Sequence, residues 1–255
     1  MSVPYLTPDW PAHAWVRAAF TLRTGGVSSP PFDSLNVGAH VGDRPEAVDE
    51  NRRRIGRHLG LPGEPAWLEQ VHGKEVADLD SAVATARADA SFTHRAGHVC
   101  AVQVADCLPV LLAARSGSAV AAAHCGWRGL ASGVLEATVR ALGVPAGELY
   151  AWLGPAIGPA AFEVGAEVRT AFLAQDARAA AAFAGNSRGR WQCDLFELAR
   201  QRLAQLGVPA VFGGGVCTQS DPQRFFSYRR DGRCGRMAAL IWMAKARRGK
   251  ASSAC

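Results

Sequence analysis

Short apolar runs alternate along this chain with longer segments of helical period, and this alternation constrains the fold most strongly. Apolar runs of about four to eight residues that end at turn residues are typical of strands in a sheet that is covered on both faces. The runs predict strands at residues 16–22, 66–71, 99–104, 108–113, 120–124, 149–153 and 237–243.

Amphipathic segments between these runs predict helices. Residues 45–59 begin with a proline and end before Gly60, a common helix stop. Asp194 with Glu197 three residues later is an N-cap pattern, and it predicts a helix at residues 195–206. We also predict helices at residues 130–142 and at the alanine-rich residues 174–184, since alanine is the best helix former.

These elements predict an α/β or α+β fold, in which a mixed sheet is layered with flanking helices. A chain of 255 residues is long enough for one large domain or two small ones. The stretches rich in proline and glycine are short turns rather than linkers, which favours a single catalytic domain over residues 1–244. Residues 245–255 carry basic side chains and no acid, and this pattern predicts a disordered tail.

Composition limits the compartment and the partners. Seven cysteines, an odd number without a Cys-x-x-Cys pair, favour reduced thiols in the cytoplasm over a disulfide framework. The sequence shows neither a secretory signal nor an apolar run long enough to span a membrane, so we expect no membrane partner. The net charge of +6 is concentrated in the tail, and without a basic groove we expect no nucleic acid partner.

Three polar residues that suit a metal stand where apolar runs end, namely His72, Cys107 and His124. Strand ends along one rim of an α/β sheet are where such folds place their sites. Two histidines and a cysteine match the three-ligand set of a catalytic zinc, which keeps its fourth position open. The three residues lie far apart in the sequence, so core histidines with a buried cysteine remain the alternative.

The same residues also permit other chemistry. Cys107 can act as a nucleophile, with His72 or His124 as its base and Asp106 orienting that base. Copper is an alternative metal, because imidazole and thiolate ligands suit it. The chain has no His-x-His pair of the kind that builds multicopper centres, so a true laccase is not expected.

Arginines beside glycines or at a helix start indicate anion binding. Arg23 leads into a glycine-rich turn, Arg128 stands at a predicted helix start, and Arg229 and Arg230 follow aromatic residues. Turn amides, helix N-termini and the arginine fork all suit phosphate, although a surface position is the default for each arginine. Aromatic residues that could stack on a flat heterocycle are Phe32, Trp127, Phe225, Phe226 and Tyr228.

A series of motifs gives the chain a resemblance to a known family. The motifs include Arg23-Thr24-Gly25-Gly26, Ser34-Leu35-Asn36-Val37-Gly38, Gln70-Val71-His72-Gly73, Ala88-Asp89-Ala90, Ala105-Asp106-Cys107-Leu108-Pro109, His124-Cys125-Gly126-Trp127-Arg128-Gly129 and Phe226-Ser227-Tyr228-Arg229-Arg230-Asp231. They occur in order across most of the chain, which therefore resembles the YfiH family of laccase-domain, polyphenol-oxidase-like proteins. Cys125 departs from the family, in which alanine is common at this position, and it could alter metal selectivity.

The resemblance implies a layered α/β fold related to Cys–His hydrolases of the toxin type. It implies that His72, Cys107 and His124 hold zinc. It also implies a purine nucleoside phosphorylase that converts adenosine, inosine and methylthioadenosine to the free base and ribose 1-phosphate. The same protein would deaminate adenosine, with purine nucleosides and phosphate as its substrates. Other assignments in the family are a copper-dependent laccase and an amidase that edits a peptidoglycan precursor.

We predict further roles around this centre. Cys107, Asp106 and Arg128 are predicted to be catalytic, and Asp106 or Glu163 would move protons during deamination. The predicted substrate-binding residues are Arg23, Asn36, Asp89, Arg229 and Arg230. A non-catalytic binding protein for nucleosides or metal is a further alternative, and we expect a monomer or a small homo-oligomer.

Overall fold

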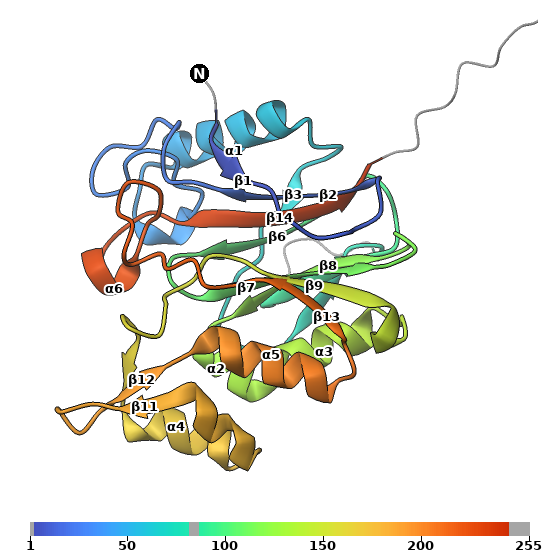
Figure 1. Ribbon diagram of the computed structural model, residues 1–255. Coiled ribbons are helices and arrows are strands. Elements are labelled where there is room, and N and C mark those ends of the chain that lie inside the picture. Colours follow the sequence, from blue (N-terminus) through green and yellow to red (C-terminus); the bar gives the residue numbers. More distant parts are fainter. Residues whose placement is uncertain (1–2, 82–86, 245–255) are drawn as a thin grey trace, which may run out of the picture.

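Two large sheets stack face to face, with helices on the two outer faces (Figure 1). The computed structural model describes residues 3–81 and 87–244, so the predicted tail at residues 245–255 lies outside the described residues. Both sheets contain parallel and antiparallel pairs. The predicted layered α/β class with mixed sheets in a single domain is therefore confirmed.

The first sheet has the strand order β1-β2-β14-β6-β3. Its strands are β1 (Tyr5–Leu6), β2 (Val16–Thr21), β14 (Met237–Met243), β6 (Val99–Val104) and β3 (Pro65–Ala66). Strand β14 pairs antiparallel with β2 and β6, and β3 pairs parallel with β6. Helix α1 (Pro45–Leu59) covers the outer face, where its Ile55 packs with Leu240 and Trp242 of β14.

The second sheet has the strand order β13-β9-β7-β8-β5-β4. Its strands are β13 (Ala210–Gly213), β9 (Leu149–Leu153), β7 (Leu108–Ala114), β8 (Val120–Cys125), β5 (Ala90–Thr93) and β4 (Val76–Asp78). Helices α2 (Trp127–Ser132), α3 (Val134–Ala141) and α5 (Leu195–Gln205) cover its outer face. Leu135 and Leu203 of these helices share a core with Leu112 of β7.

The core between the two sheets explains the unbroken apolar runs in the sequence. Phe20 and Ile241 of the first sheet pack in one cluster with Leu111 and Ala122 of the second. Every residue of β6, β7, β8 and β14 is buried, because both faces of each of these strands are covered. Polar residues in such strands therefore stand out, and Gln103 is one of them.

Smaller elements lie beside this double layer. A short sheet has the order β10-β12-β11, with β10 (Glu163–Val164), β12 (Trp191–Cys193) and β11 (Phe183–Gly185). Beside it lie α4 (Ala166–Leu173) and the 3-10 turn η3 (Ala177–Ala182). The remaining elements are η1 (Ala39–Val41), η2 (Ala146–Glu148) and α6 (Tyr228–Asp231). In the described part of the chain, none of the helices has the length and apolar character that crossing a bilayer requires.

Three of the predicted elements differ in the structure. The strand predicted at residues 66–71 is wrong beyond Ala66, because the N–H of Val71 bonds to a carboxylate instead of a strand neighbour. The helix predicted at residues 130–142 begins earlier and is broken at Gly133, whose φ of 93° no helix allows. The helix predicted at residues 174–184 is a 3-10 turn followed by β11, since pairing with β12 overrides alanine's helix propensity.

Candidate active site

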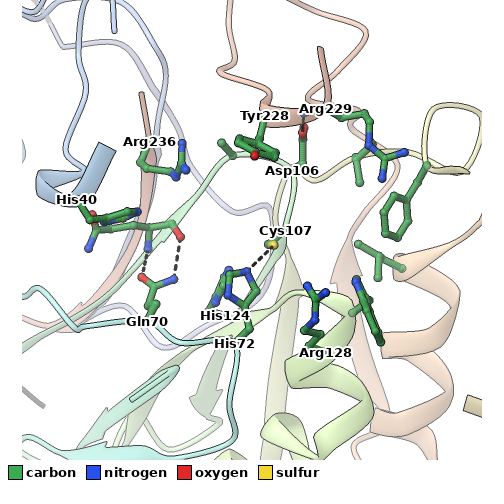
Figure 2. Close-up of a pocket in the computed structure, with 16 residues that line it drawn as sticks. His40, Gln70, His72, Asp106, Cys107, His124, Arg128, Tyr228, Arg229 and Arg236 are labelled. Atoms are coloured by element: carbon green, nitrogen blue, oxygen red, sulfur yellow. Dashed lines mark hydrogen bonds between the residues drawn. The ribbon is translucent and has the colours of Figure 1, made fainter. Parts of the chain in front are cut away.

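Three different segments bring the predicted metal ligands together. His72 lies in the loop after β3, Cys107 in the turn between β6 and β7, and His124 near the end of β8. Strands β7 and β8 are antiparallel neighbours that pair Pro109 with His124, so Cys107 and His124 meet at one rim. The candidate ligand atoms of the three side chains all lie within 4.8 Å of one another (Figure 2).

The separation of the donor atoms fits a tetrahedral metal ion. The Cys107 Sγ and the His72 Nε2 are 3.8 Å apart. Zinc bonds of about 2.3 Å to sulfur and about 2.0 Å to nitrogen at a tetrahedral angle place the two atoms about 3.5 Å apart. Gly126 keeps this space open, because a Cβ there would lie 2.8 Å from the Cys107 Sγ and 3.1 Å from the His72 Cδ2. The residues present therefore fit a tetrahedral metal site with three protein ligands and an open fourth position.

A single buried carboxylate positions two of the three ligands. Asp89 accepts hydrogen bonds from the backbone N–H groups of Val71, His72 and Gly73 at 3.1, 3.0 and 2.6 Å. Its Oδ1 also lies 2.8 Å from the Nδ1 of His124. The contact at Nδ1 leaves the Nε2 of His124 as the free donor, and such outer carboxylates fix the tautomer of a metal-binding histidine. Asp89 therefore lies behind the ligands and does not line the cavity.

Two residues other than glycine have a positive φ in the described part of the chain, and both lie at this centre. They are His72 at φ 60° and Asp106 at φ 88°. A side chain in this region costs about 1–3 kcal/mol and persists when its surroundings hold it. Asp89 holds His72, and the Asp106 carboxylate accepts hydrogen bonds from Thr218, Ser227 and the backbone N–H of Arg229. One strained residue is the candidate ligand His72 and the other directly precedes the candidate ligand Cys107, so both lie at the metal-binding trio.

The electrostatics of the trio favour a thiolate beside an imidazolium when no metal is bound. Burial raises the pKa of a thiol, but the charge and hydrogen bonds of His124 and His72 outweigh that effect and lower the pKa of Cys107 to about 6. Burial lowers the pKa of a histidine, but the charge of Cys107 and the hydrogen bond to Asp89 outweigh it and raise the pKa of His124 to about 9. A thiolate is the form that binds a metal or attacks a substrate.

The trio opens onto a cavity of about 500 Å³. One wall is apolar and aromatic, formed by Trp127, Ile157, Phe162 and Leu195. The described residues that complete the lining are His40, Gln70, Gln103, Ala105, Asp106, Arg128, Tyr228, Arg229 and Arg236. A volume of this size matches a small-molecule site, and it is large enough for a nucleoside.

The lining of the cavity is strongly positive. Arg128, Arg229 and Arg236 all reach it, and Figure 2 shows them arranged around Cys107. Asp106 is the single acid among the described lining residues, and both of its oxygens already accept hydrogen bonds. An anionic ligand is therefore favoured over a cationic one.

The structure separates the predicted substrate-binding residues into two groups. Arg229 lines the cavity, together with the predicted catalytic residues Asp106 and Arg128. Arg23 instead binds the carbonyl oxygens of Asp33 and Pro222, and Arg230 binds the carbonyl oxygens of Thr218, Gln219 and Phe225; neither reaches the lining.

Three other predicted residues also lie outside the cavity wall. Asn36 is buried and bonds to Gly38 and to the backbone N–H of Arg236. Glu163 forms an ion pair with Arg188 away from the lining. Cys125 is buried in the core below the second sheet, where desolvation raises the pKa of its thiol well above the usual value.

Sequence reasoning missed several lining residues. His40, Gln70, Gln103 and Arg236 were not predicted for the site, although Gln103 interrupts an apolar run and could have been noticed on that ground. His40 and Arg236 carry no such signal, because only the fold brings their loops to the rim. Of the aromatic candidates, Trp127 and Tyr228 reach the cavity, whereas Phe32, Phe225 and Phe226 are buried in the core.

A comparison with models of known protein families identifies the family of this chain. The family model described as "Multi-copper polyphenol oxidoreductase laccase" matches residues 17–244. This chain belongs to that family, the laccase-domain or YfiH family. The predicted resemblance is confirmed.

Named relatives of the YfiH family are similar over nearly the whole chain. A Pseudomonas aeruginosa protein named purine nucleoside phosphorylase is 58% identical over 94% of this chain and 98% of its own length. The Escherichia coli protein named purine nucleoside phosphorylase YfiH is 54% identical over 93% of this chain and 98% of its own length. A crystal structure from Neisseria meningitidis is 50% identical with a TM-score of 0.91, and covers 94% of this chain and 99% of its own.

Proposed function

We propose that this chain is a zinc-dependent purine nucleoside phosphorylase. The observation that carries the proposal is the composition of one cavity, in which a His–Cys–His donor set, an aromatic wall and three guanidinium groups share about 500 Å³. Such a space suits a ligand with a flat heterocycle and a phosphate anion. The names of the relatives support the same substrates.

The proposed reaction joins phosphate to the sugar of a nucleoside. An oxygen of inorganic phosphate forms a bond to C1′ of the ribose, and the bond from C1′ to N9 of the purine breaks. The electron pair of the broken bond stays on the purine, which takes up a proton. The products are the free base and ribose 1-phosphate.

The cavity residues bind and orient the two substrates. The wall of Trp127 and Phe162, with Arg128 and Arg229 stacked on these rings, offers flat surface to the purine, and the positive charge of the lining attracts phosphate. Tyr228 carries a ring hydroxyl that can donate a proton to the leaving purine. A bound zinc ion would supply a Lewis acid held by His72, Cys107 and His124.

The donor set supports zinc over a multicopper centre. Among the described residues, His72, Cys107 and His124 form the single group of three or more potential ligands. Three nitrogen and sulfur ligands with an open fourth position suit a catalytic zinc. Copper could occupy the same three ligands, and metal content of the protein purified from its native cells would distinguish the two ions.

Adenosine deamination is a finer part of the proposal. Water would add to C6 of adenosine and ammonia would leave, giving inosine. The cavity has room for the nucleoside beside the metal ligands, but the two residues predicted to move protons are otherwise engaged. The carboxylate oxygens of Asp106 already accept hydrogen bonds from Thr218, Ser227 and the backbone N–H of Arg229. Glu163 forms an ion pair with Arg188. We therefore expect the proton transfer of deamination to depend on a group other than these two residues.

One observation favours a second candidate, a cysteine hydrolase or amidase. The three side chains that such an enzyme needs lie side by side, with Cys107 as nucleophile, His124 as base and Asp89 as the carboxylate that orients the base. The His124 Nδ1 and the Asp89 Oδ1 are 2.8 Å apart. This candidate predicts a covalent adduct on Cys107 during turnover and no inhibition by chelators. The phosphorylase predicts loss of activity on chelation and no adduct.

The proposal is tested by chromatography of purines after incubation of the zinc-loaded protein with adenosine or inosine. Reactions run with and without phosphate, and a His72→Ala variant runs beside the wild type. We expect adenine or hypoxanthine to appear when phosphate is present, and to be absent in the variant and in chelator-treated protein. Metal-loaded wild type that releases no base would contradict the proposal.

A further inference from the structure

One end of the cavity holds a guanidinium without an acid beside it. Arg236, His40 and Gln103 line this end, and Figure 2 shows Arg236 and His40 together, across Cys107 from Arg128 and Arg229. The hydrogen-bond partners of the Arg236 side chain among the described residues are two backbone carbonyls and a thiol, and no carboxylate. Its positive charge is therefore available to a ligand.

The surrounding residues hold Arg236 in place. Its backbone N–H donates to Oδ1 of the buried Asn36 at 2.8 Å, and its Nη1 donates to the carbonyls of Cys234 and Gly235 at 3.0 and 3.1 Å. Its aliphatic stem passes over Gly38, where a Cβ would lie 2.7 Å from the Arg236 Cγ. A guanidinium fixed in this way loses little freedom when it binds an anion.

The neighbouring Gln103 carries a polar atom without a partner. Its side chain is on the buried strand β6, the residue is 6% exposed, and its Oε1 has no hydrogen-bond donor in the described part of the chain. Its backbone N–H and carbonyl are both taken by the side chain of Gln70, at 2.7 and 2.9 Å. Buried polar atoms are nearly always paired, so an unpaired amide in a cavity wall indicates a place for a ligand.

We propose that Arg236 with His40 forms the subsite for inorganic phosphate, and that Gln103 beside it binds a hydroxyl of the sugar that receives the phosphate. The proposal rests on the proposed phosphorylase function. The fork of Arg236 matches two phosphate oxygens, and the side-chain amide of Gln103, whose Oε1 is buried and unpaired, can rotate to bind a ribose hydroxyl. The product, ribose 1-phosphate, carries both groups next to each other.

The other end of the cavity suits the purine. The guanidinium of Arg128 lies 4.6 Å from the Trp127 ring centre, and that of Arg229 lies 5.3 Å from the Phe162 ring centre. These two arginines already stack on the aromatic wall, whereas Arg236 is the lining arginine at the polar end. The substrate would therefore lie with its base toward Trp127 and its phosphate toward Arg236, across the metal ligands.

The test of the phosphate subsite uses Arg236→Met, which keeps the stem and the backbone N–H. The matched control is Arg233→Met, which removes the same charge outside the cavity, where Arg233 binds the Gly42 carbonyl. We expect Arg236→Met to raise the KM for phosphate about tenfold or more, and to change the KM for adenosine much less. Arg236→Lys should give an intermediate value, and Arg233→Met should match the wild type.

The role of Gln103 is tested with Gln103→Leu and two substrate analogues, 2′-deoxyadenosine and 3′-deoxyadenosine. We expect the wild type to prefer adenosine over at least one analogue by about tenfold, and the variant to lose that preference. An equal preference in Gln103→Leu and the wild type would overturn the assignment of Gln103. Retention of the wild-type KM for phosphate in Arg236→Met would overturn the assignment of Arg236.

Phosphate binding without turnover separates this inference from the proposed function. Titration of inorganic phosphate into the metal-loaded protein is followed by calorimetry. If phosphate binds, binding is lost in Arg236→Met, and no nucleoside is cleaved, the subsite stands and the phosphorylase proposal falls. If purine is released with phosphate but Arg236→Met binds phosphate as the wild type does, the function stands and the subsite falls.

Discussion

At the scale of single residues, two aspartates give this centre its shape. Asp89 accepts three backbone N–H groups around His72 and the ring of His124, and Asp106 is bonded by Thr218 and Ser227. Each carboxylate stabilises a left-handed residue in a turn that the sequence places between strands. The sequence singles out both aspartates, Asp89 for substrate binding and Asp106 for catalysis, but chain order does not show which way a carboxylate faces.

Asp89→Asn should weaken metal binding. An amide can still accept a hydrogen bond, but its NH₂ group faces backbone N–H donors that the carboxylate now satisfies. We expect the affinity for zinc to fall by about 10–100-fold, measured by competition with a chromogenic chelator. Asp80→Asn is the control, because Asp80 is also bonded to histidines but lies outside the cavity lining. Equal zinc affinities in Asp89→Asn and the wild type would refute this positioning role.

Gly126→Ala should lower the metal content without unfolding the chain. The added Cβ would press on the Cys107 Sγ and on the ring of His72. Zinc per chain, measured by atomic absorption after dialysis, should drop well below that of Gly147→Ala, where a Cβ meets nothing within 4 Å. Full zinc occupancy in Gly126→Ala would show that the ligands sit elsewhere.

The thiol of Cys107 should be reactive in metal-free protein. Its pKa of about 6 predicts that alkylation by iodoacetamide, followed by mass spectrometry, rises with pH around 6 rather than around 9. Cys217→Ser serves as the background, since Cys217 is also partly accessible. Bound zinc should protect Cys107 from alkylation. A rate that rises only near pH 9 would contradict the thiolate form.

At the scale of elements, local signals predicted most of the central strands and the best-capped helices. The sequence-based bounds of α1 are those of the structure, and α5 begins at the predicted cap. Residues 67–71, which lead to His72, are predicted as a strand from local composition, but the hydrogen-bond partners of this loop are Asp89 and Gln103, distant in sequence. The small sheet was missed for the same reason, since its strands are held by long-range pairing.

The N-cap of α5 gives a prediction at this scale. Asp194 Oδ1 accepts from the N–H groups of Phe196 and Glu197 at 2.9 and 3.1 Å. Asp194→Ala should lower the free energy of unfolding by about 1 kcal/mol, measured in urea, and Asp194→Asn should restore most of it. Zinc content should not change, because α5 contributes no ligand. An unchanged urea midpoint in Asp194→Ala would contradict the cap.

At the scale of the whole molecule, the two stacked sheets bring separate loops to one rim. The loop after β3, the turn between β6 and β7 and the end of β8 supply the metal ligands. Helix α2 and the segment between β9 and β10 supply the aromatic wall, and α2 with the segment before β14 supplies the arginines. The sequence predicted the ligands, because their residue types are distinctive at strand ends. It could not predict His40 or Arg236, because only the packing of distant loops places them at the cavity.

The most direct test of the account follows phosphorus during turnover. Zinc-loaded protein is incubated with adenosine and inorganic phosphate and observed by ³¹P NMR, with adenine measured in the same sample. If the protein is a phosphorylase, we expect a new ribose 1-phosphate resonance that grows in step with adenine. We expect neither product in the Cys107→Ser variant. Adenine without the new resonance would show hydrolysis rather than phosphorolysis, and neither product from the zinc-loaded wild type would contradict the proposed function.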